Sequence, residues 1–480
     1  MFLTTSCTKF LEEKPLTFLN SSNFYKTKDD ITAAVYSVYA PLQTYYAGGG
    51  YANMTWSVWE LPSDQSYSND GAGVIDNTNI DNYAFGPEMN YYNNWWKNAY
   101  LIISRANTVI LNVPNAVNVS ADIKNSAIGE ARFLRGVAYF ELAMGYGDVP
   151  LVTEQTTELF PTRTPVLDIY NFAIEDLKFA VQNLPVTWPK GSDYGRATKY
   201  AAESYLAKLY LKMAGYPIQD QGKFALAASA SKDVIDNGPY SLYANVMDNW
   251  NPSAAPREQI FIVDKSRAVS NGSYFPLFWA PRGLPQLAAE PGGDFIGAFL
   301  PNQTFYDDFP DDDPRKGEFF MTSARSYMDT SLVLTLPQPI VAKYWGPMYN
   351  TGTDQDIVRL RFAEVLLIYA EAANEVTATT PEAYNALNAV RSRAFGDNSH
   401  DYSSLTQDEF RKAVWRERDL ELCFEGVRWS DMVRTQTSRN GTIFDYKNIN
   451  NFSPTQKNML FPIPTIDLQT NLKLTQNPEY

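Results

Sequence analysis

Histidine and cysteine are almost absent from this chain of 480 residues, which contains one histidine and two cysteines. His400 stands in the segment Gly-Asp-Asn-Ser-His with no plausible nucleophile nearby in sequence, so we interpret it as a solvated loop residue. Two cysteines, Cys7 and Cys423, exclude a disulfide framework. The chain also has no HExxH, P-loop, GxGxxG or CxxC motif. Zinc-protease, nucleotide-binding and thiol-redox chemistry therefore lack their usual residues, and the sequence predicts no metal and no other cofactor.

Positive charge is scarce as well. The chain has 40 Lys and Arg against 54 Asp and Glu, a net charge of −14, and no run rich in Lys or Arg. So acidic a chain is a poor candidate for binding nucleic acid or anionic lipid. What is abundant is aromatic residues, at 14% of the chain. That supply exceeds what a helical core needs, so we expect some of these rings on the surface.

The stretch Arg359–Glu375, which reads RLRFAEVLLIYAEAANE, organises the predicted fold. Glu364, Glu371 and Glu375 recur at intervals of seven and four residues, so they share one helical face with Arg361. Nearly every other residue of the stretch is apolar, and a helix with so narrow a polar stripe must be covered on several sides. The pattern predicts the central helix of an all-helical scaffold.

Apolar periodicity and capping residues predict further helices at 27–46, 91–111, 125–146, 165–184, 198–214, 224–236, 382–395, 407–423 and 427–434. Their pairing resembles tetratricopeptide-like helix pairs, although no strict repeat of about 34 residues can be traced. The predicted fold class is mostly α, a tetratricopeptide-like helical scaffold with long irregular loops and a few short strands, one of them at 259–263. We expect a leader segment at 1–20 and a single domain over 21–480, with its helices at about 21–46, 91–240 and 355–440. The loop-rich regions fall at 47–90 and 248–353.

The first residues, MFLTTSC, look like the end of a lipoprotein signal. Met1–Thr5 is too short to cross a membrane, but small residues just before a cysteine are what a lipoprotein signal peptidase recognises. Two interpretations stay open: Cys7 carries a lipid, or it is an ordinary cysteine in a frayed terminus. Cys423, between Leu422 and Phe424, is interpreted instead as a buried structural thiol.

Several short motifs, spread along the whole chain, resemble the signatures of the SusD/RagB family. The C-terminal ones are Arg359–Glu375, Ala389–Arg393, Glu417–Leu422, Phe424–Asp431 and Phe461–Pro464. The N-terminal ones are Cys7 followed by Phe10-Leu11, Arg132–Arg135, Tyr139-Phe140 and Tyr146–Val152. The chain departs from the family pattern in its short signal segment and in Glu479, where the family often has glycine.

The resemblance implies an outer-membrane lipoprotein, anchored through Cys7 and exposed at the cell surface, with a tetratricopeptide-like scaffold. It implies a glycan- or nutrient-binding role and a SusC-like TonB-dependent transporter as partner, over which such a protein acts as a lid. It implies no enzymatic activity. The alternative that stays open is the same scaffold binding peptides or another nutrient.

A sugar ring offers an apolar C–H face that stacks on an aromatic ring, while nearby polar side chains bond its hydroxyls. The site should therefore lie on loops with aromatic residues and short polar neighbours. The candidate ligand-binding residues are Trp56, Trp59, Asp64 and Tyr67 in the first loop-rich region and Tyr274, Phe278, Trp279 and Arg282 in the second. Packing inside the protein is the open alternative for the three tryptophans, and we interpret Trp345, just before the central helix, as structural.

Clustered carboxylates allow two further interpretations. A glycosidase needs two carboxylates, and Asp64 with Asp70 or Asp307 with Asp308 could serve, but any acidic chain offers such pairs by chance. The aspartates of the segment 309–315 do not follow the pattern of a Ca²⁺ loop, so we expect a turn with solvated charges there.

Overall fold

Long helices form the body of the protein. The computed structural model describes residues 24–46, 56–189, 194–291, 295–349 and 352–480. About 51% of it is helical, which confirms the predicted fold class. The long helices are α1 (Lys28–Tyr39), α5 (Asn90–Asn112), α6 (Ala121–Tyr146), α7 (Val166–Asn183), α8 (Lys199–Ala214), α9 (Lys223–Asn237), α13 (Phe362–Val376), α14 (Pro381–Phe395) and α15 (Gln407–Glu421).

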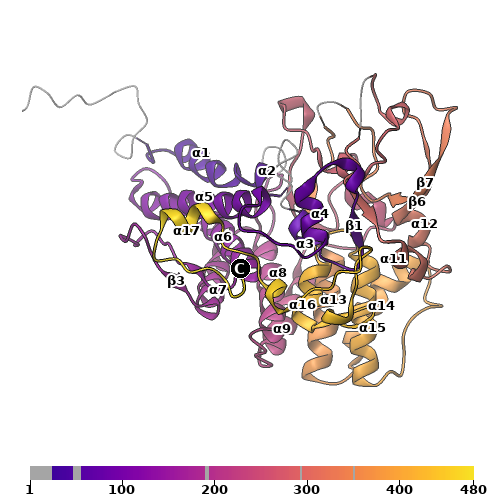
Figure 1. Ribbon diagram of the computed structural model, residues 1–480. Coiled ribbons are helices and arrows are strands. Elements are labelled where there is room, and N and C mark those ends of the chain that lie inside the picture. The colour runs from indigo at the N-terminus through magenta and orange to yellow at the C-terminus, as the bar shows by residue number, and fades with distance from the viewer. Residues whose placement is uncertain (1–23, 47–55, 190–193, 292–294, 350–351) are drawn as a thin grey trace, which may run out of the picture.

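Successive helices of the body pack on one another in chain order. Helix α5 packs on α6, α6 on α7, α7 on α8 and α8 on α9. The chain then leaves the body for a long loop-rich segment and returns as α13, which packs on α9, α14 and α15. Figure 1 shows this progression from α5, α6 and α7 on the left, through α8 and α9, to the orange helices α13, α14 and α15 on the right. Helix pairs stacked in this way are typical of tetratricopeptide-like scaffolds, as the sequence predicts.

Helix α13 is the central helix, and its sequence explains its position. All its residues from Phe362 to Asn374 are buried, including Glu364 and Glu371 of the predicted polar stripe, while Glu375 of the same stripe is half-buried. Those glutamates meet cations from neighbouring helices: Glu371 lies 2.5 Å from Arg434 and Glu364 lies 3.0 Å from Lys208. Because buried charges need partners, the narrow stripe fixes which helices surround α13.

The predicted helix over 27–46 divides into α1 and the short α2 (Leu42–Tyr45). The division falls at Pro41, which has no N–H to give to the carbonyl of Ser37 four residues earlier. The Arg105 side chain donates to that carbonyl instead, at 2.7 Å. Proline thus ends the helix, and a side chain from α5 satisfies the freed oxygen.

The central helix begins later than the sequence predicts, at Phe362 instead of Arg359. Arg359 and Arg361 belong to strand β8 (Ile357–Arg361), which pairs antiparallel with β4 (Gln259–Val263), and the helix begins at Phe362. Arg361 has extended backbone angles, φ −135° and ψ 162°. Its guanidinium bonds carboxylates on other elements of the protein, so it does not share a helical face with the glutamates of α13.

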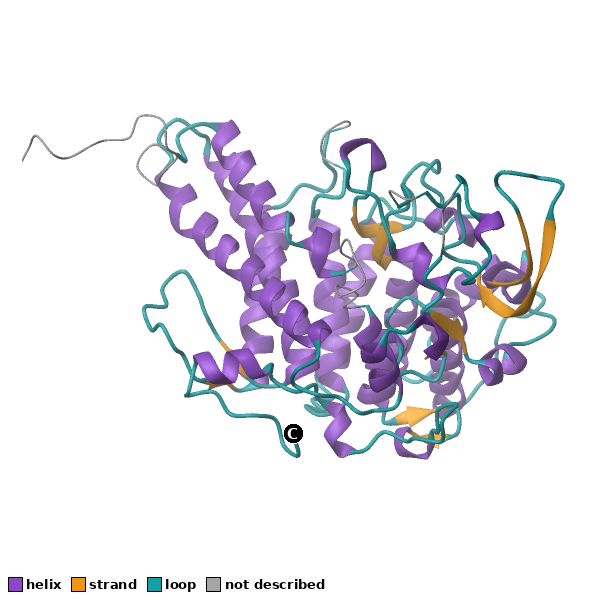
Figure 2. Ribbon diagram, turned by 45° about the horizontal axis from the view of Figure 1, so that its top comes forward, coloured by secondary structure: helices purple, strands orange, loops and turns teal. Residues whose placement is uncertain are grey.

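Strands occur as antiparallel pairs. Besides β4 with β8, the described residues form β1 (Ser66–Ser68) with β5 (Phe299–Pro301), β2 (Val149–Pro150) with β3 (Arg163–Thr164), β6 (Phe320–Arg325) with β7 (Val333–Val341), and β9 (Thr437–Ser438) with β10 (Gly441–Thr442). The strand predicted at 259–263 is β4 and is confirmed. Figure 2 shows the long hairpin of β6 and β7 at the edge of the molecule, away from most of the helices.

Two segments interrupt the helical body, and both contain more structure than the sequence predicts. The first loop region, residues 56–89, contains α3 (Ser57–Glu60), β1 and α4 (Ile75–Asp81). The second loop region, residues 264–349 and 352–356, contains α10 (Phe275–Trp279), β5, α11 (Gln303–Asp308), α12 (Arg315–Phe319), β6 and β7. After α15 the chain continues through α16 (Arg428–Thr435) and α17 (Thr465–Thr470).

One hydrophobic core extends through the body and reaches both loop regions. It includes Ile31 near the start and Ile463 in the C-terminal segment, so the prediction that this segment packs back on the scaffold is confirmed. A smaller separate cluster lies within the second loop region, around Leu287, Phe295 and Met348. Within the described ranges, no helix is both long enough and apolar enough to span a bilayer.

Candidate functional site

The predicted tryptophans of the first loop region lie in the core. Trp56 is 2% exposed and Trp59 is 8% exposed, so the prediction that they present rings to a ligand is wrong. Trp59 makes edge-to-face contacts with Trp95 and Phe461, with ring centroids 5.1 and 5.4 Å apart. Edge-to-face packing adds to the free energy gained from burying such large rings. The segment therefore packs its tryptophans against the core of the helical body.

Asp64 is also buried, and its partners are arginines rather than solvent. Its two carboxylate oxygens accept hydrogen bonds from the Arg428 guanidinium at 2.7 Å each, and Arg439 donates to it from the backbone at 3.0 Å. Burial alone would raise the pKa of Asp64, but the charges of Arg428 and Arg439 hold that pKa well below its ordinary value. Asp64 is thus a permanently charged anchor for the loop and has no free oxygen facing a sugar.

Trp279 and Phe278 in the second loop region are each 1% exposed, so exposure is wrongly predicted for both. The Trp279 ring stacks on Tyr344, with centroids 5.8 Å apart, and contacts Phe424 of the body at 5.4 Å. Both residues belong to the five-residue helix α10, and their rings face the protein interior instead of solvent. They attach the second loop region to the core.

Three predicted residues keep access to solvent. Tyr67 and Tyr274 are half-buried and Arg282 is exposed, so their role as ligand-binding residues stays a prediction. The Tyr67 hydroxyl donates to the Gln338 side chain on β7 at 3.2 Å, and Arg282 donates to the backbone carbonyl of Gly71. Both contacts join the two loop regions.

One exposed and three half-buried aromatic residues lie near the small second core. We define the aromatic patch as Tyr274, Tyr327, Trp345 and Tyr349. Tyr327, in the turn between β6 and β7, is 37% exposed and stacks on Trp345 with centroids 5.9 Å apart and planes 27° from parallel. Trp345 in turn contacts the buried Phe295. The buried Phe295 therefore supports the stacked pair, and the outer face of the stack offers an apolar surface.

Polar groups border the aromatic patch. The Arg267 guanidinium lies over the Tyr349 ring, 3.4 Å from its centroid, and 3.8 Å from the Asp354 carboxylate. Burial, and then the nearby Tyr349, raise the pKa of Tyr327 to about 12, so its hydroxyl is neutral at physiological pH. Flat rings beside a guanidinium, a carboxylate and a neutral hydroxyl can hold both the apolar face and the hydroxyl rim of a sugar.

Sequence reasoning missed this patch for identifiable reasons. Trp345 lies shortly before the central helix in sequence and is interpreted as structural, but strand β8 comes between the two and the half-buried ring lies over the second core. Tyr327 stands in the polar segment Ser-Tyr-Met-Asp. A tyrosine is not needed to form a hairpin turn, so its presence there was a usable signal of surface function.

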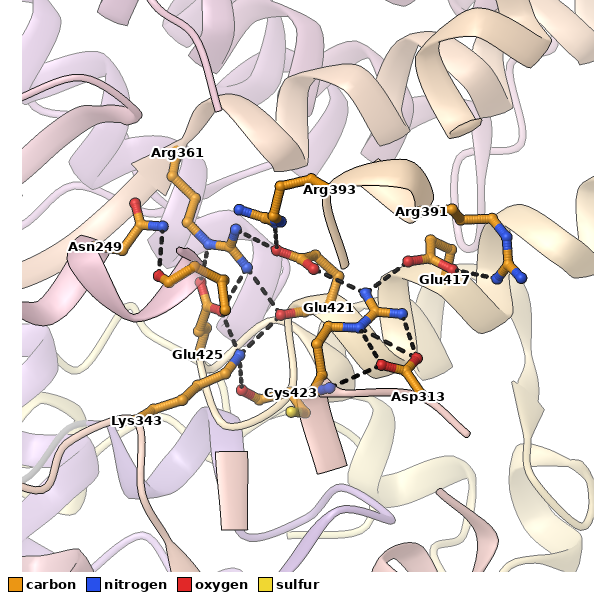
Figure 3. A network of polar contacts seen from close by, with 12 residues as sticks. Asn249, Asp313, Lys343, Arg361, Arg391, Arg393, Glu417, Glu421, Cys423 and Glu425 are labelled. Atoms are coloured by element: carbon orange, nitrogen blue, oxygen red, sulfur yellow. Dashed lines mark hydrogen bonds and ion pairs between the residues drawn. The ribbon is translucent and has the colours of Figure 1, made fainter. Parts of the chain in front are cut away.

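A buried network of ion pairs holds the second loop region on the body (Figure 3). Arg315 of α12 lies 2.6 Å from Glu417 and 2.8 Å from Glu421, both on α15. Lys343, which follows β7, donates to Glu425 at 2.8 Å, and Arg361 bonds the same carboxylate. The network joins five cations (Arg315, Lys343, Arg361, Arg391, Arg393) to five carboxylates (Glu258, Asp313, Glu417, Glu421, Glu425).

Equal charge explains how so many ions are buried together. Burial would raise the pKa of Glu421, but Arg393, Arg361 and Arg315 hold it well below its ordinary value. Asp313 belongs to the segment expected to be a solvated turn, and that expectation is wrong for it: it is 2% exposed and bonds Arg315 at 2.7 Å. Arg361 and Lys343 likewise hold the pKa of Glu425 below its ordinary value, and carboxylates that keep their charge suit a structural clamp. Over the described parts of the chain, no group of three or more His, Cys, Asp or Glu residues could hold a metal ion.

The protein has a helical body with tetratricopeptide-like stacking. Buried ion pairs hold a loop-rich region on that body, and the aromatic patch lies on the loop-rich region. These features define a class of mostly α-helical proteins built on a tetratricopeptide-like scaffold. Residues 322–480 match the family model described as the SusD family, and residues 9–211 match one described as starch-binding, associating with the outer membrane. The chain belongs to the SusD/RagB family, as its motifs predict.

Known relatives agree along almost the whole chain. SusD-like protein P2 of Formosa agariphila is 29% identical, covering 98% of this chain and 96% of its own. The crystal structure of a SusD superfamily protein from Parabacteroides distasonis matches with a TM-score of 0.86 and 26% identity, over 96% of this chain and 100% of the other. A laminarin-binding SusD-like protein has the same fold, with a TM-score of 0.78 and 24% identity, over 95% of this chain and 100% of the other.

Proposed function

We propose that this protein is a surface-exposed lipoprotein of the outer membrane that captures oligosaccharides on its aromatic patch and delivers them to a SusC-like TonB-dependent transporter. Family membership supports the general role, because one matching family model is described as starch-binding and associated with the outer membrane. The protein binds its ligand without transforming it.

The observation that carries the proposal is the stacked pair of Tyr327 and Trp345. Large rings are usually buried, and a stack that keeps Tyr327 exposed is not needed to fill the core of this protein. Because the two rings are stacked, the outer face of the stack suits the apolar face of a sugar unit, while Arg267 and Asp354 are close enough to bond hydroxyls at the edge of Tyr349.

The membrane anchor and the transporter partnership rest on the family resemblance. Cys7, the proposed lipidation site, and the leader expected at 1–20 lie outside the described residues. The proposed partner contact and the single domain over 21–480 follow from the whole-chain likeness to SusD-like proteins. Labelling with a palmitate analogue, lost in Cys7→Ala, is the expected sign of the anchor.

Calorimetry with a glycan panel that includes laminarin and starch oligosaccharides tests the binding role. We expect one class of glycan to bind, and Trp345→Ala and Tyr327→Ala to weaken it by at least tenfold, since stacking on a ring contributes about 1–3 kcal/mol per contact. Phe160→Ala is the matched control, because Phe160 is 40% exposed but far from the patch in sequence. Wild-type protein that binds no glycan, with its fold intact, would refute the proposal.

Peptide binding is the alternative with an observation of its own. A polar cleft of about 610 Å³ is lined by Asp64, Trp415, Arg416, Arg439 and Asn440 among others. Such a cleft suits backbone amides better than sugar faces. If peptides bind and Trp345→Ala leaves their affinity unchanged, this cleft rather than the aromatic patch is the ligand site.

A further inference from the structure

A second cavity lies in the helical body, away from both loop regions. Its volume is about 320 Å³, room for about ten water molecules at ~30 Å³ each. Helices α6, α7, α8 and α16 and the C-terminal segment line it, and no residue of the aromatic patch does. Much of the wall is apolar: Ala143, Met144, Val166, Val433, Met459 and Leu460.

Lys212 of α8 lines this cavity and is buried, with 4% of the residue exposed. Its ammonium group makes no hydrogen bond or ion pair with any described residue. The pKa of Lys212 is lowered to about 7, chiefly by burial and then by the charge of Arg434, while Asp431 opposes the shift. Buried lysines are normally paired, so a lysine without a partner facing a cavity indicates room for an anion.

Two more donors line the same cavity. The Tyr170 hydroxyl is buried and has no hydrogen-bond partner, in a residue that is 0% exposed. Arg163 donates only to neutral oxygens, namely the backbone carbonyls of residues 146, 148 and 475 and the Asn477 amide, and no described carboxylate lies within 4.0 Å of it. The Tyr170 hydroxyl is therefore a buried donor without an acceptor, which costs free energy, and an anionic ligand would relieve that cost.

The remaining charged groups of the wall do not neutralise these donors. Asp148 accepts the backbone N–H of Val166 at 2.8 Å, and Lys457 lies over the Tyr480 ring. Glu479 is exposed. The cavity is therefore lined by three cations against two carboxylates, in a protein whose net charge is −14.

From this geometry we propose that the cavity binds a small organic carboxylate, with its carboxyl group beside Lys212 and the Tyr170 hydroxyl and an apolar chain of about four to six carbons against Met144, Val433 and Leu460. The apolar wall favours a ligand with a hydrocarbon chain, and the hydrogen-bond donors favour a negatively charged head group. The site is independent of glycan capture, since it shares no residue with the aromatic patch.

Calorimetry and thermal unfolding with hexanoate, butanoate, acetate and 1-hexanol test the proposal on the full chain. We expect hexanoate to bind with a dissociation constant of about 1 mM or lower and to raise the melting temperature. Butanoate should bind more weakly, and acetate and 1-hexanol should not bind measurably. Hexanoate and acetate of equal affinity, or no binding of hexanoate at about 10 mM, would overturn the proposal.

Two substitutions separate the site from the fold. Lys212→Met removes an unpaired buried charge and Tyr170→Phe an unpaired hydroxyl, so neither should destabilise the protein. We expect Lys212→Met to weaken hexanoate at least tenfold and Tyr170→Phe to weaken it about threefold. Lys178→Met, which removes an exposed lysine paired with Glu175 on α7, is the control and should bind as wild type does. Unchanged hexanoate affinity in Lys212→Met would refute the proposal.

The pH dependence gives a third readout. The carboxylate needs the protonated lysine, so affinity should be constant near pH 6 and fall as pH rises above 7, because the free protein then loses the Lys212 proton. The other groups facing the lysine, Arg434 and Asp431 of α16, keep their charge over this range. Lys212→Met should show no such fall, and a parallel fall in both proteins would contradict the proposed contact.

Discussion

The two loop regions look alike in sequence, yet they place their aromatic rings differently. The first region buries its tryptophans: Trp56 and Trp59 face the core, and only Tyr67 stays half-buried. The second region is fastened by charge, through Arg315 and Lys343, and keeps Tyr327 at the surface. Both regions are held by buried rings and by ion pairs, since Trp279 packs on Phe424 in the second and Asp64 bonds Arg428 in the first, but only the second keeps a ring stack at the surface.

The difference follows from what each region has beneath it. The first lies directly on the main core, so its rings gain most by packing inward. The second packs rings such as Trp279 on the main core too, but it also has a small core of its own around Leu287, Phe295 and Met348. Rings such as Trp345 can only cover that core, and one face stays toward solvent. Composition is therefore a poor guide to exposure without knowing what lies below.

Breaking the charged attachment should have the largest effect. Arg315→Met leaves Glu417 and Glu421 short of one buried cation, and removing one partner of a buried pair costs about 3–5 kcal/mol. Chemical denaturation should show that loss of unfolding free energy. Lys232→Met is the control, because its pair with Asp236 is exposed and contributes less than about 0.5 kcal/mol. Equal losses in both variants would remove the distinction between the regions.

The same substitution at two tryptophans sharpens the comparison. Trp59→Ala removes a ring packed between Trp95 and Phe461 and should cost about 3–4 kcal/mol of unfolding free energy. Trp345→Ala removes a half-exposed ring and should cost about 1 kcal/mol, while glycan affinity falls. Denaturation and calorimetry on both variants check this. A Trp59→Ala protein of wild-type stability that has lost glycan binding would reverse the assignment.

The helical body was predictable because period and caps are local. The segment 407–423 begins with Thr406 and Glu409, which form the capping box that the sequence indicates. Cys423 is buried, as expected from its apolar neighbours. Buried ion pairs are not local: nothing near Arg361 in sequence announces Glu421, 60 residues away. The site depends on such long-range contacts. Five of the eight ligand-binding residues predicted from the sequence are therefore buried in the structure: Trp56, Trp59, Asp64, Phe278 and Trp279.

The first region also contains a buried carboxyl group that makes its attachment pH-sensitive. Burial raises the pKa of Glu60 to about 8, although Gly426 and Ser66 donate hydrogen bonds to it. A raised pKa in the folded state means that stability is full below the ordinary value near 4.5 and is lost as pH rises through 8.

Glu60→Gln keeps both contacts, since its amide can accept from the Gly426 N–H and donate to Ser66, but it does not ionise. We expect the loss of unfolding free energy between pH 5 and 8 to shrink by about 3–4 kcal/mol relative to wild type. Denaturation at several pH values measures it, with Glu175→Gln on the surface of α7 as the control. Parallel stability curves for Glu60→Gln and wild type would show that Glu60 is not protonated in the folded protein.

The smallest effect concerns the contact between the two regions. The Tyr67 hydroxyl of β1 donates to Gln338 of β7, one of the polar bonds that join them. Tyr67→Phe keeps the ring and removes this bond, so it should cost about 0.5–1 kcal/mol. Because β7 leads toward Trp345, a patch positioned through this bond should also bind glycan about two- to threefold more weakly in Tyr67→Phe, with Tyr36→Phe on α1 as the control. If stability falls and glycan affinity does not, the second region holds its rings without help from the first, and the charged network alone positions them.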